Sequence, residues 1–436
     1  MAATDQRLFV TGLAATDLTA RARQWVAEHV PDAWRQAALE GGASAIRKVR
    51  PRADYEAWYP VFAASGLVAP TWPVEYGGAG LTPAEARTVE IELAPYNLGR
   101  LNPLGLSLAA PALFAFGTEE QRLRYLPPIV RNQEVWCQLF SEPGAGSDLA
   151  SLATRAERDG DEWVITGQKV WNTWAHLADF GVLLARTDAD VPKRQGITYF
   201  LIGMHEPGVE VRPLRHITGE IDFNEVFLDG ARVPDRQRVG EVNAGWKVGN
   251  ATLSGERQMV SGSGSGGVDR IGGGGAERLV QLARRRSAEG HPGGWADPLV
   301  RQRLMQVLSE ERIRNWTNQR IRAGIKAGRS PGPESSVGKV HQGDLNQRMQ
   351  ILATDLLGAD AVAWSIDAAD DGATDAGERY AESLPYELKG MLRSRANTIE
   401  GGTTEVNKNI IAERVLGLPR EPDPWQQSPW REVPRN

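Results

Sequence analysis

Two short segments constrain this chain more than any other part of its sequence. The first is Ser141-Glu-Pro-Gly-Ala-Gly-Ser-Asp148, where two glycines and a proline predict a loop whose backbone N–H groups can approach a ligand closely. The second is Gly167-Gln-Lys-Val-Trp-Asn-Thr173, which adds the flat apolar face of Trp171 and the hydroxyl of Thr173. Either segment alone is equally well explained as an ordinary turn. Together they predict a site for a planar ligand with polar edges, such as a flavin.

The segment from Phe140 to Thr173 resembles the acyl-CoA dehydrogenase family, in which it holds the isoalloxazine ring of FAD. The resemblance runs from about Trp25 to Arg420, and the run Arg215-His-Ile-Thr-Gly-Glu-Ile-Asp-Phe-Asn-Glu225 resembles the bacterial, actinobacterial branch. It implies an FAD-dependent acyl-CoA dehydrogenase that desaturates an acyl-CoA thioester between its α and β carbons. An electron-transfer flavoprotein would then accept the electrons, and the enzyme would be a dimer or tetramer.

Composition excludes several other classes of protein. A chain of 436 residues exceeds what one hydrophobic core usually serves, so two or three domains are expected. A net charge of −5 without long single-sign runs argues against a nucleic-acid partner. A single cysteine, Cys137, fits a reducing compartment, and no apolar run approaches the roughly 20 residues of a membrane span. A cytoplasmic protein without a signal peptide is expected.

The hydrophobic period changes twice along the chain, from helical to strand-like and back to helical. Helix starts are predicted at Thr82-Pro-Ala-Glu85 and at Thr118-Glu-Glu-Gln121. The glycine clusters within residues 261–275 are read either as a linker or as close helix packing beside a wide substrate cavity. The expected fold is α+β and multidomain: an N-terminal helical domain (1–135), a middle antiparallel β-barrel or sandwich (136–245), a C-terminal four-helix bundle (246–418) and an extended tail (419–436), as in acyl-CoA dehydrogenases.

The catalytic base has two candidates. Removing the weakly acidic α-proton of a thioester needs a carboxylate beside the α-carbon. The family places that carboxylate either in a loop before the last helix, directly before Gly-Thr, or on the first helix of the C-terminal bundle. In the loop Thr398-Ile-Glu-Gly-Gly-Thr-Thr-Glu405, matching Gly402-Thr403 to the family pattern puts Gly401 at the base position and Glu400 one residue early.

The alternative site is Leu253-Ser-Gly-Glu-Arg257, which resembles the Glu-Arg pair of the isovaleryl-CoA and long-chain branches. In those branches the base comes from the earlier helix and a small residue occupies the loop position. Glu256 and Gly401 reproduce this combination. Glu256 is therefore the preferred base, Glu400 stays open, and Arg257 would brace the substrate site. An ordinary salt-bridged helix residue remains the competing interpretation of Glu256.

The resemblance assigns the remaining site residues by position. Flavin contacts fall on Phe140, Ser141, Gly146, Ser147, Trp171 and Thr173, with Ser147 also near the acyl-CoA pantetheine. Weaker matches place Arg285, Asp355, Thr403 and Glu405 toward the phosphate, ribityl and adenine parts of FAD. His176 is expected to be a surface or core histidine rather than a general acid. No group of His, Cys and acidic residues has metal-ligand spacing.

Two other functions remain open at this stage. The chain could be a flavin oxidase or monooxygenase on the same scaffold, which rapid flavin reoxidation in air would reveal. It could also be one subunit of an α2β2 heterotetramer with an incomplete site, since actinobacterial steroid-degrading members of the family pair unlike subunits. The sequence does not indicate the acyl group.

Overall fold

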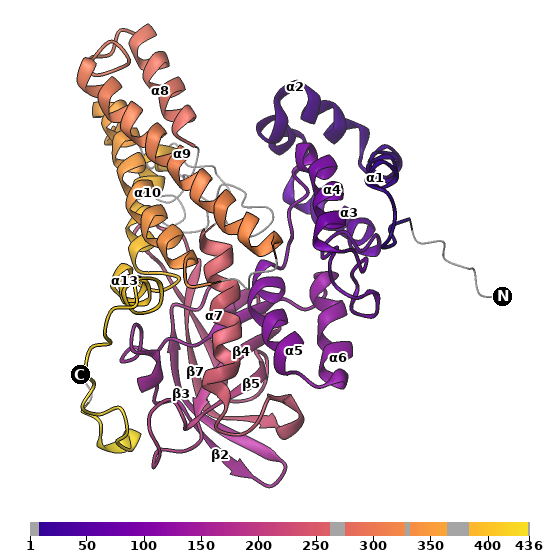
Figure 1. Ribbon diagram of the computed structural model, residues 1–436, viewed down its shortest axis with the longest axis vertical. Helices are drawn as coiled ribbons and strands as arrows, with labels where there is room; N and C mark the ends of the chain where they lie inside the picture. The colour runs from indigo at the N-terminus through magenta and orange to yellow at the C-terminus, as the bar shows by residue number, and fades with distance from the viewer. Residues whose placement is uncertain (1–7, 262–274, 328–331, 364–382, 435–436) are drawn as a thin grey trace, which may run out of the picture.

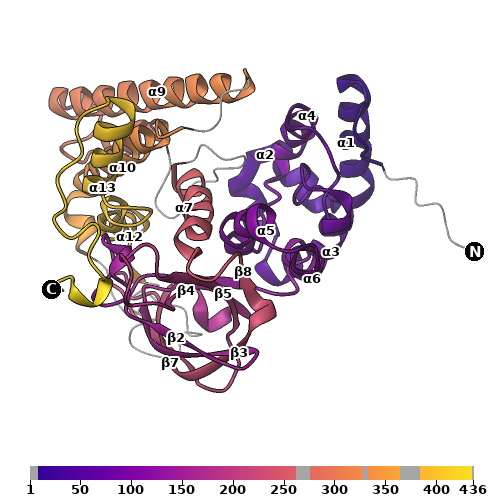
Figure 2. The same cartoon turned by 60° about the horizontal axis from the view of Figure 1, so that its bottom comes forward.

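The computed structural model describes residues 8–261, 275–327, 332–363 and 383–434. Two groups of helices stand on either side of a central helix, α7, and a β-sheet lies at one end of both groups (Figures 1 and 2). The expected order of a helical domain, a β domain and a helical bundle is confirmed. The glycine-rich residues 262–274, for which two interpretations were open, lie outside the described part.

The N-terminal helices pack around an aromatic core. Trp25, Tyr59 and Phe62 are buried in it, and the ring centroids of Trp25 and Phe62 lie 6.0 Å apart. The helix starts predicted at Thr82 and Thr118 are both confirmed as capping boxes, in which the threonine hydroxyl accepts a backbone N–H. The helices are α1 (Ala15–His29), α2 (Asp32–Val49), α3 (Arg52–Ala64), α4 (Pro83–Leu93), α5 (Ala110–Phe116) and α6 (Glu119–Val130).

The middle domain is one eight-stranded sheet in the order β6-β7-β3-β2-β4-β5-β8, with β1 paired to β4. The β1–β4 and β2–β4 pairings are parallel and the others antiparallel. The strands are β1 (Trp136–Leu139), β2 (Arg155–Asp159), β3 (Glu162–Val170), β4 (Phe180–Arg186), β5 (Ile197–Gly203), β6 (Val209–Leu214), β7 (Phe223–Pro234) and β8 (Arg238–Val239).

The C-terminal helices form the third part. Leu304, Leu345 and Leu352 are buried in their shared core. The helices are α7 (Gly245–Ser261), α8 (Ala276–Ala288), α9 (Pro298–Lys326), α10 (Ser335–Leu357), α12 (Tyr386–Ser394) and α13 (Thr404–Ile410). Across the described ranges, no helix has both the length and the apolar character that crossing a bilayer requires.

Candidate functional site

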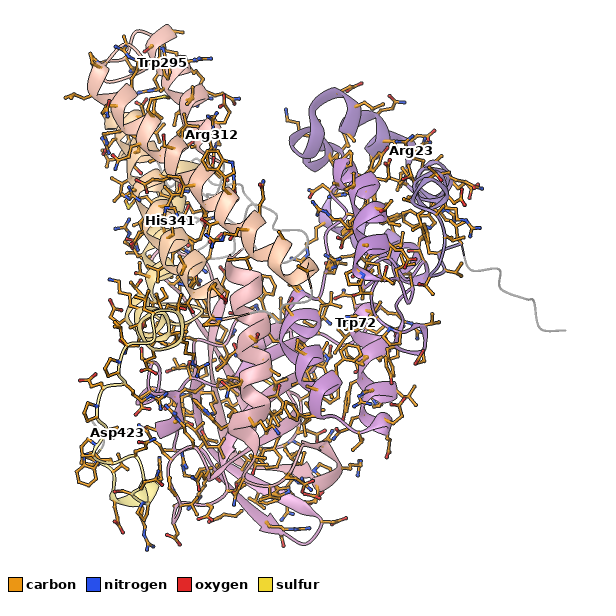
Figure 3. All side chains as sticks on the ribbon, in the orientation of Figure 1. Arg23, Trp72, Trp295, Arg312, His341 and Asp423 are labelled. Carbon is orange, nitrogen blue, oxygen red and sulfur yellow. The ribbon has the colours of Figure 1, made fainter. Side chains whose placement is uncertain are left out.

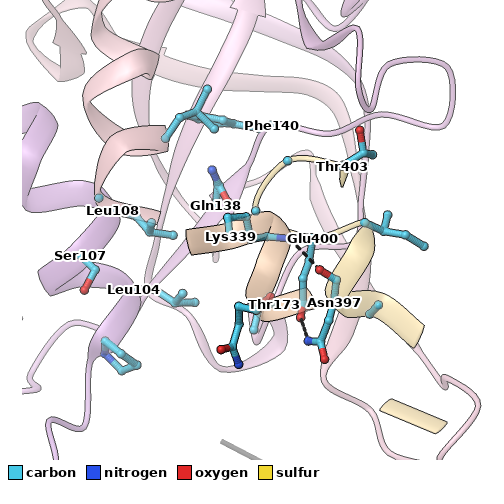
Figure 4. A pocket seen from close by; sticks show the side chains of 18 of the residues that line it. Leu104, Ser107, Leu108, Gln138, Phe140, Thr173, Lys339, Asn397, Glu400 and Thr403 are labelled. Carbon is cyan, nitrogen blue, oxygen red and sulfur yellow. Dashed lines mark hydrogen bonds between the residues drawn. The ribbon is translucent and has the colours of Figure 1, made fainter. Parts of the chain in front are cut away.

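A cavity of about 2660 Å3 lies where the three parts of the molecule meet. Pockets for one small molecule usually enclose about 300–1,000 Å3, so this cavity has room for two large ligands. Figure 4 shows apolar Leu104, Leu108 and Phe140 together with polar Lys339 and Glu400 around the same space. The predicted residues that line the cavity are Phe140, Ser141, Gly146, Ser147, Trp171, Thr173, Glu400, Gly401 and Thr403.

The glycine-rich loop is held at its start by a buried ion pair. Lys169 on β3 is fully buried, and its ammonium donates to the Glu142 carboxylate at 2.8 Å and to the Phe140 and Leu184 carbonyls at 3.0 and 2.8 Å. Glu142 also accepts the Thr154 backbone N–H at 2.9 Å. These bonds use all three donors of the ammonium. The loop therefore leaves the sheet in one fixed direction.

Burial raises the pKa of Glu142, but Lys169 and the N–H donors around the carboxylate outweigh burial and lower it. The sequence interpretation missed this pair. The signal was available in the alternation of β3, where Trp163 and Ile165 are inward-facing core residues and Lys169 follows at the same two-residue period.

The segment after β3 presents a strained tryptophan to the cavity. Trp171 has φ of +63° and Trp174 has φ of +53°, a left-handed conformation that bulky residues rarely adopt. The Asn172 between them is buried and donates to the Gln138 carbonyl at 2.7 Å, which fixes this turn against β1. The Trp171 side chain stays 61% exposed. Backbone strain that leaves a large apolar face open at a cavity wall indicates a ligand site.

Glu400 is held by its neighbours. The two terminal guanidinium nitrogens of Arg393, Nη2 and Nη1, donate to its carboxylate at 2.8 and 3.2 Å, and the Asn397 amide donates at 3.0 Å. Figure 4 shows the Asn397 contact. The following Gly401 and Gly402 have φ of +67° and +86°, which turns the chain sharply into α13. Thr403 begins that helix, because its hydroxyl accepts the Val406 N–H at 3.2 Å.

The other candidate base belongs to α7. The side chains of Glu256 and Arg257 lie outside the described part, but their helix is well anchored. The Thr252 hydroxyl donates to the Leu108 carbonyl at 3.0 Å, and Leu253 and Gly255 line the cavity. A Cβ on Gly255 would stand 2.0 Å from the Ser107 carbonyl oxygen, so only glycine allows this close approach.

Three predicted cofactor residues lie away from the cavity lining. Asp355 on α10 is exposed and accepts from Arg303 at 2.7 Å. Arg285 on α8 is 63% exposed, with its Nε 4.0 Å from the Glu289 carboxylate. Glu405 is exposed in the first turn of α13. None of these three residues lines the cavity beside the glycine-rich loop (141–148), so their roles stay predictions.

A polar network borders the cavity beside the Trp171 turn. His216 contacts the Asp222 carboxylate at 3.3 Å and the Thr218 hydroxyl at 3.2 Å, and Lys389 forms an ion pair with Glu220. The hydrogen bond with His216 lowers the pKa of Asp222, and this effect outweighs burial, which raises it. The His216, Glu220 and Asp222 ligand atoms lie within 4.8 Å of one another, a grouping that the sequence spacing did not reveal. His216 pairs with Asp222, whereas the Glu220 carboxylate accepts from the Thr218 hydroxyl and pairs with Lys389, so each of the three groups already has a protein partner.

His176 does not belong to this network. It is exposed, and its Nδ1 lies 3.0 Å from the Asn224 side-chain oxygen. The sequence predicted a surface or core histidine, and the structure places His176 at the surface.

Comparison with known proteins identifies the scaffold. Sequence models of the N-terminal, middle and C-terminal domains of acyl-CoA dehydrogenases match residues 14–133, 137–230 and 243–416. The chain belongs to the acyl-CoA dehydrogenase family. As a member it is an oxidoreductase that acts on acyl-CoA, and proteins of this family are FAD-dependent flavoproteins.

Several relatives and solved structures are similar over almost their whole length. The acyl-CoA dehydrogenase IpdE1 of Mycobacterium tuberculosis is 38% identical over 93% of this chain and 98% of its own. IpdE1 of Mycolicibacterium smegmatis is 36% identical over the same shares. The crystal structure of the ChsE4-ChsE5 complex from Mycobacterium tuberculosis is 27% identical, with a TM-score of 0.67 over 97% of this chain and 100% of that chain.

The residues present fit FAD. The exposed Trp171 face can cover one side of a flat ring, and the Thr173 and Ser141 side chains border the same cavity. Ser147 and Gly146 line its edge from the glycine-rich loop. Residues of both sequence segments that were predicted to contact the flavin thus line the same cavity.

Proposed function

We propose that this acyl-CoA dehydrogenase desaturates its substrate between the α and β carbons, with Glu256 as the base. The observation that carries this assignment is the engagement of Glu400. Its carboxylate already accepts three hydrogen bonds, two of them from the Arg393 guanidinium. A carboxylate with this arrangement has little capacity left to take a substrate proton.

The reaction removes two hydrogens. The α-proton passes to the base carboxylate and the β-hydrogen leaves with its electron pair, which FAD accepts when bound. The chain supplies a cavity that would hold the thioester between α7 and the glycine-rich loop. Leu253 and Gly255, just before Glu256 on α7, line the cavity, which supports this assignment, and Gly401 leaves the loop position small.

Substitution of each glutamate tests the assignment. Glu256→Gln is expected to abolish anaerobic bleaching of the flavin by acyl-CoA while the protein still binds FAD. Glu400→Gln should keep measurable flavin reduction, because its contribution is to hold the loop. Normal turnover in Glu256→Gln with none in Glu400→Gln would reverse the assignment. A panel of linear, branched and ring-bearing acyl-CoAs in the same assay would define the substrate class.

A second candidate is that the chain works as one half of a hetero-oligomer. Exposed apolar residues on α9 support an interface with another chain, like or unlike: Ile313 and Trp316 are 50% and 63% exposed and Leu299 is 74% exposed. Large exposed apolar residues along one helix mark an interaction surface. A similar solved structure, the ChsE4-ChsE5 complex, pairs two chains.

The mass and the flavin content of the purified chain decide this second candidate. A heteromeric subunit should be colourless or inactive alone and gain flavin when its mate is added. A yellow homo-oligomer that is active alone would exclude it. Trp316→Asp should weaken either assembly.

A further inference from the structure

The C-terminal tail returns to the β domain and is fixed there by Trp430. The Trp430 backbone N–H donates to the Val191 carbonyl at 2.9 Å, and the next N–H, of Arg431, donates to Ala189 at 3.1 Å. Trp430 is only 8% exposed, although only six residues of the sequence follow it. Figure 3 places Asp423, earlier in the tail, beside the outer edge of this domain.

Under the Trp430 ring lies the buried guanidinium of Arg186. Its central carbon is 4.4 Å from the ring centroid, and the side chain is 4% exposed. Arg186 donates to the Ala150 carbonyl at 2.7 Å and to the Leu152 carbonyl at 3.0 Å. The Trp430 indole N–H donates to the carbonyl between them, of Ser151, at 3.3 Å. Two stacked side chains therefore hold three consecutive carbonyls.

These carbonyls end the glycine-rich loop that borders the flavin cavity. The Ser151 N–H donates back to the Asp148 carbonyl at 3.0 Å, and Leu149 and Ala150 line the cavity. Arg186 also holds the Lys193 carbonyl at 3.1 Å, and the Lys193 ammonium pairs with Asp148 at 2.8 Å. The end of the loop is thus connected to Trp430 by short contacts, as its start is connected to Lys169.

The tail also forms part of the cavity itself. Arg420, Glu421, Asp423, Gln426 and Gln427 line it. The segment between α13 and Trp430 therefore crosses the edge of the cavity before it reaches its anchor.

We propose that the C-terminal tail is a strap that positions the flavin-binding loop, with Trp430 as the positioning residue. The ring covers Arg186 and excludes water from the hydrogen bonds that Arg186 donates to the Ala150, Leu152 and Lys193 carbonyls. Hydrogen bonds from a charged donor are stronger where water is absent. Loss of the ring would admit water to Arg186 and loosen residues 149–152. A loosened loop must be ordered again when FAD binds, so the affinity for FAD falls.

Three full-length variants test the strap. Trp430→Ala removes both the ring and its N–H donor, and Trp430→Phe keeps a ring over Arg186 without the donor. Trp425→Ala is the matched control, because Trp425 lies in the same tail and is 42% exposed. The readouts are the FAD dissociation constant of the apoprotein by flavin fluorescence and hydrogen–deuterium exchange of the peptide over residues 141–154. The exchange measurement needs neither FAD nor turnover.

Trp430→Ala is expected to raise the FAD dissociation constant about tenfold and to speed exchange of the loop peptide. Trp430→Phe should recover most of the affinity, and Trp425→Ala should match the wild type. Unchanged exchange and affinity in Trp430→Ala, or equal losses in the two alanine variants, would overturn the proposal. An unaltered exchange rate with lower thermal stability alone would also overturn it, because Trp430 would then be structural only.

Discussion

The two walls of the cavity are built differently. On the sheet side, charged groups are buried in complete networks: Lys169 is fully buried with three acceptors and Arg186 holds three carbonyls. On the bundle side, the ion pair of Arg393 and Glu400 keeps contact with the open cavity, at 19% and 30% exposed, although Lys339 on α10 is buried. Complete buried networks rigidify a structure. We therefore expect Lys169 and Arg186 on the sheet side to be held more rigidly than the Arg393–Glu400 pair on the bundle side.

Lys169→Met should have the largest effect, because it leaves the Glu142 carboxylate buried without its cation. Removing one partner of a buried ion pair typically costs about 3–5 kcal/mol. We expect urea unfolding to show that loss and the purified protein to contain little flavin.

The control is Lys193→Met, since Lys193 pairs with Asp148, which is 57% exposed, and its loss should cost under about 1 kcal/mol. The double variant Lys169→Met/Glu142→Gln should recover part of the stability. Equal effects of the two single lysine variants would show that the sheet wall is no more rigid than the surface.

Acid should act next through the same carboxylate. The pKa of Glu142 is lowered in the folded protein, so its contribution to stability is present above the unfolded value near about 4.3 and is lost as pH falls through the folded value. Flavin release followed by fluorescence should therefore begin below about pH 4. In the double variant Lys169→Met/Glu142→Gln this acid step should be shallower, and an identical pH profile would remove Glu142 from the explanation.

Arg393→Gln should have an intermediate effect on the bundle wall. Burial lowers the pKa of Arg393, but its carboxylate neighbours, Glu400 first, outweigh burial and raise it. Because water can reach both groups, we expect a loss of about 1–3 kcal/mol in thermal unfolding, less than for Lys169. Arg395→Gln, an exposed neighbour, should be nearly neutral. A loss as large as that of Lys169→Met would contradict the contrast between the walls.

Asp355→Ala should have the smallest effect. Asp355 and Arg303 form an exposed pair, 51% and 46% exposed, so the stability should change by less than about 0.5 kcal/mol. Arg303→Ala is the control for loss of the pair. Loss of flavin in Asp355→Ala but not in Arg303→Ala would support the predicted cofactor contact of Asp355.

The catalytic base could not be chosen from the sequence alone. Glu400 stands one residue before the position that the family pattern gives to the base. Spacing alone does not show where such a side chain points in an irregular loop, so both Glu400 and Glu256 stayed open as the base. The contact of Glu400 with Arg393 joins residues only seven positions apart, but their pairing depends on how α12 turns into that loop. Capping at Thr82 and Thr118 was predictable because each box is complete within four residues.

The sequence by itself determined the family and the order of helical, β and helical domains, and it predicted the glycine-rich loop as a flavin contact, because each rests on residues close together in the chain. Only the tertiary structure decided which charges are buried and what they hold. Lys169 meets Glu142 across 27 positions, and Trp430 meets Ser151 across 279. Burial depends on what lies opposite a side chain, and long-range partners are chosen by packing rather than by local pattern.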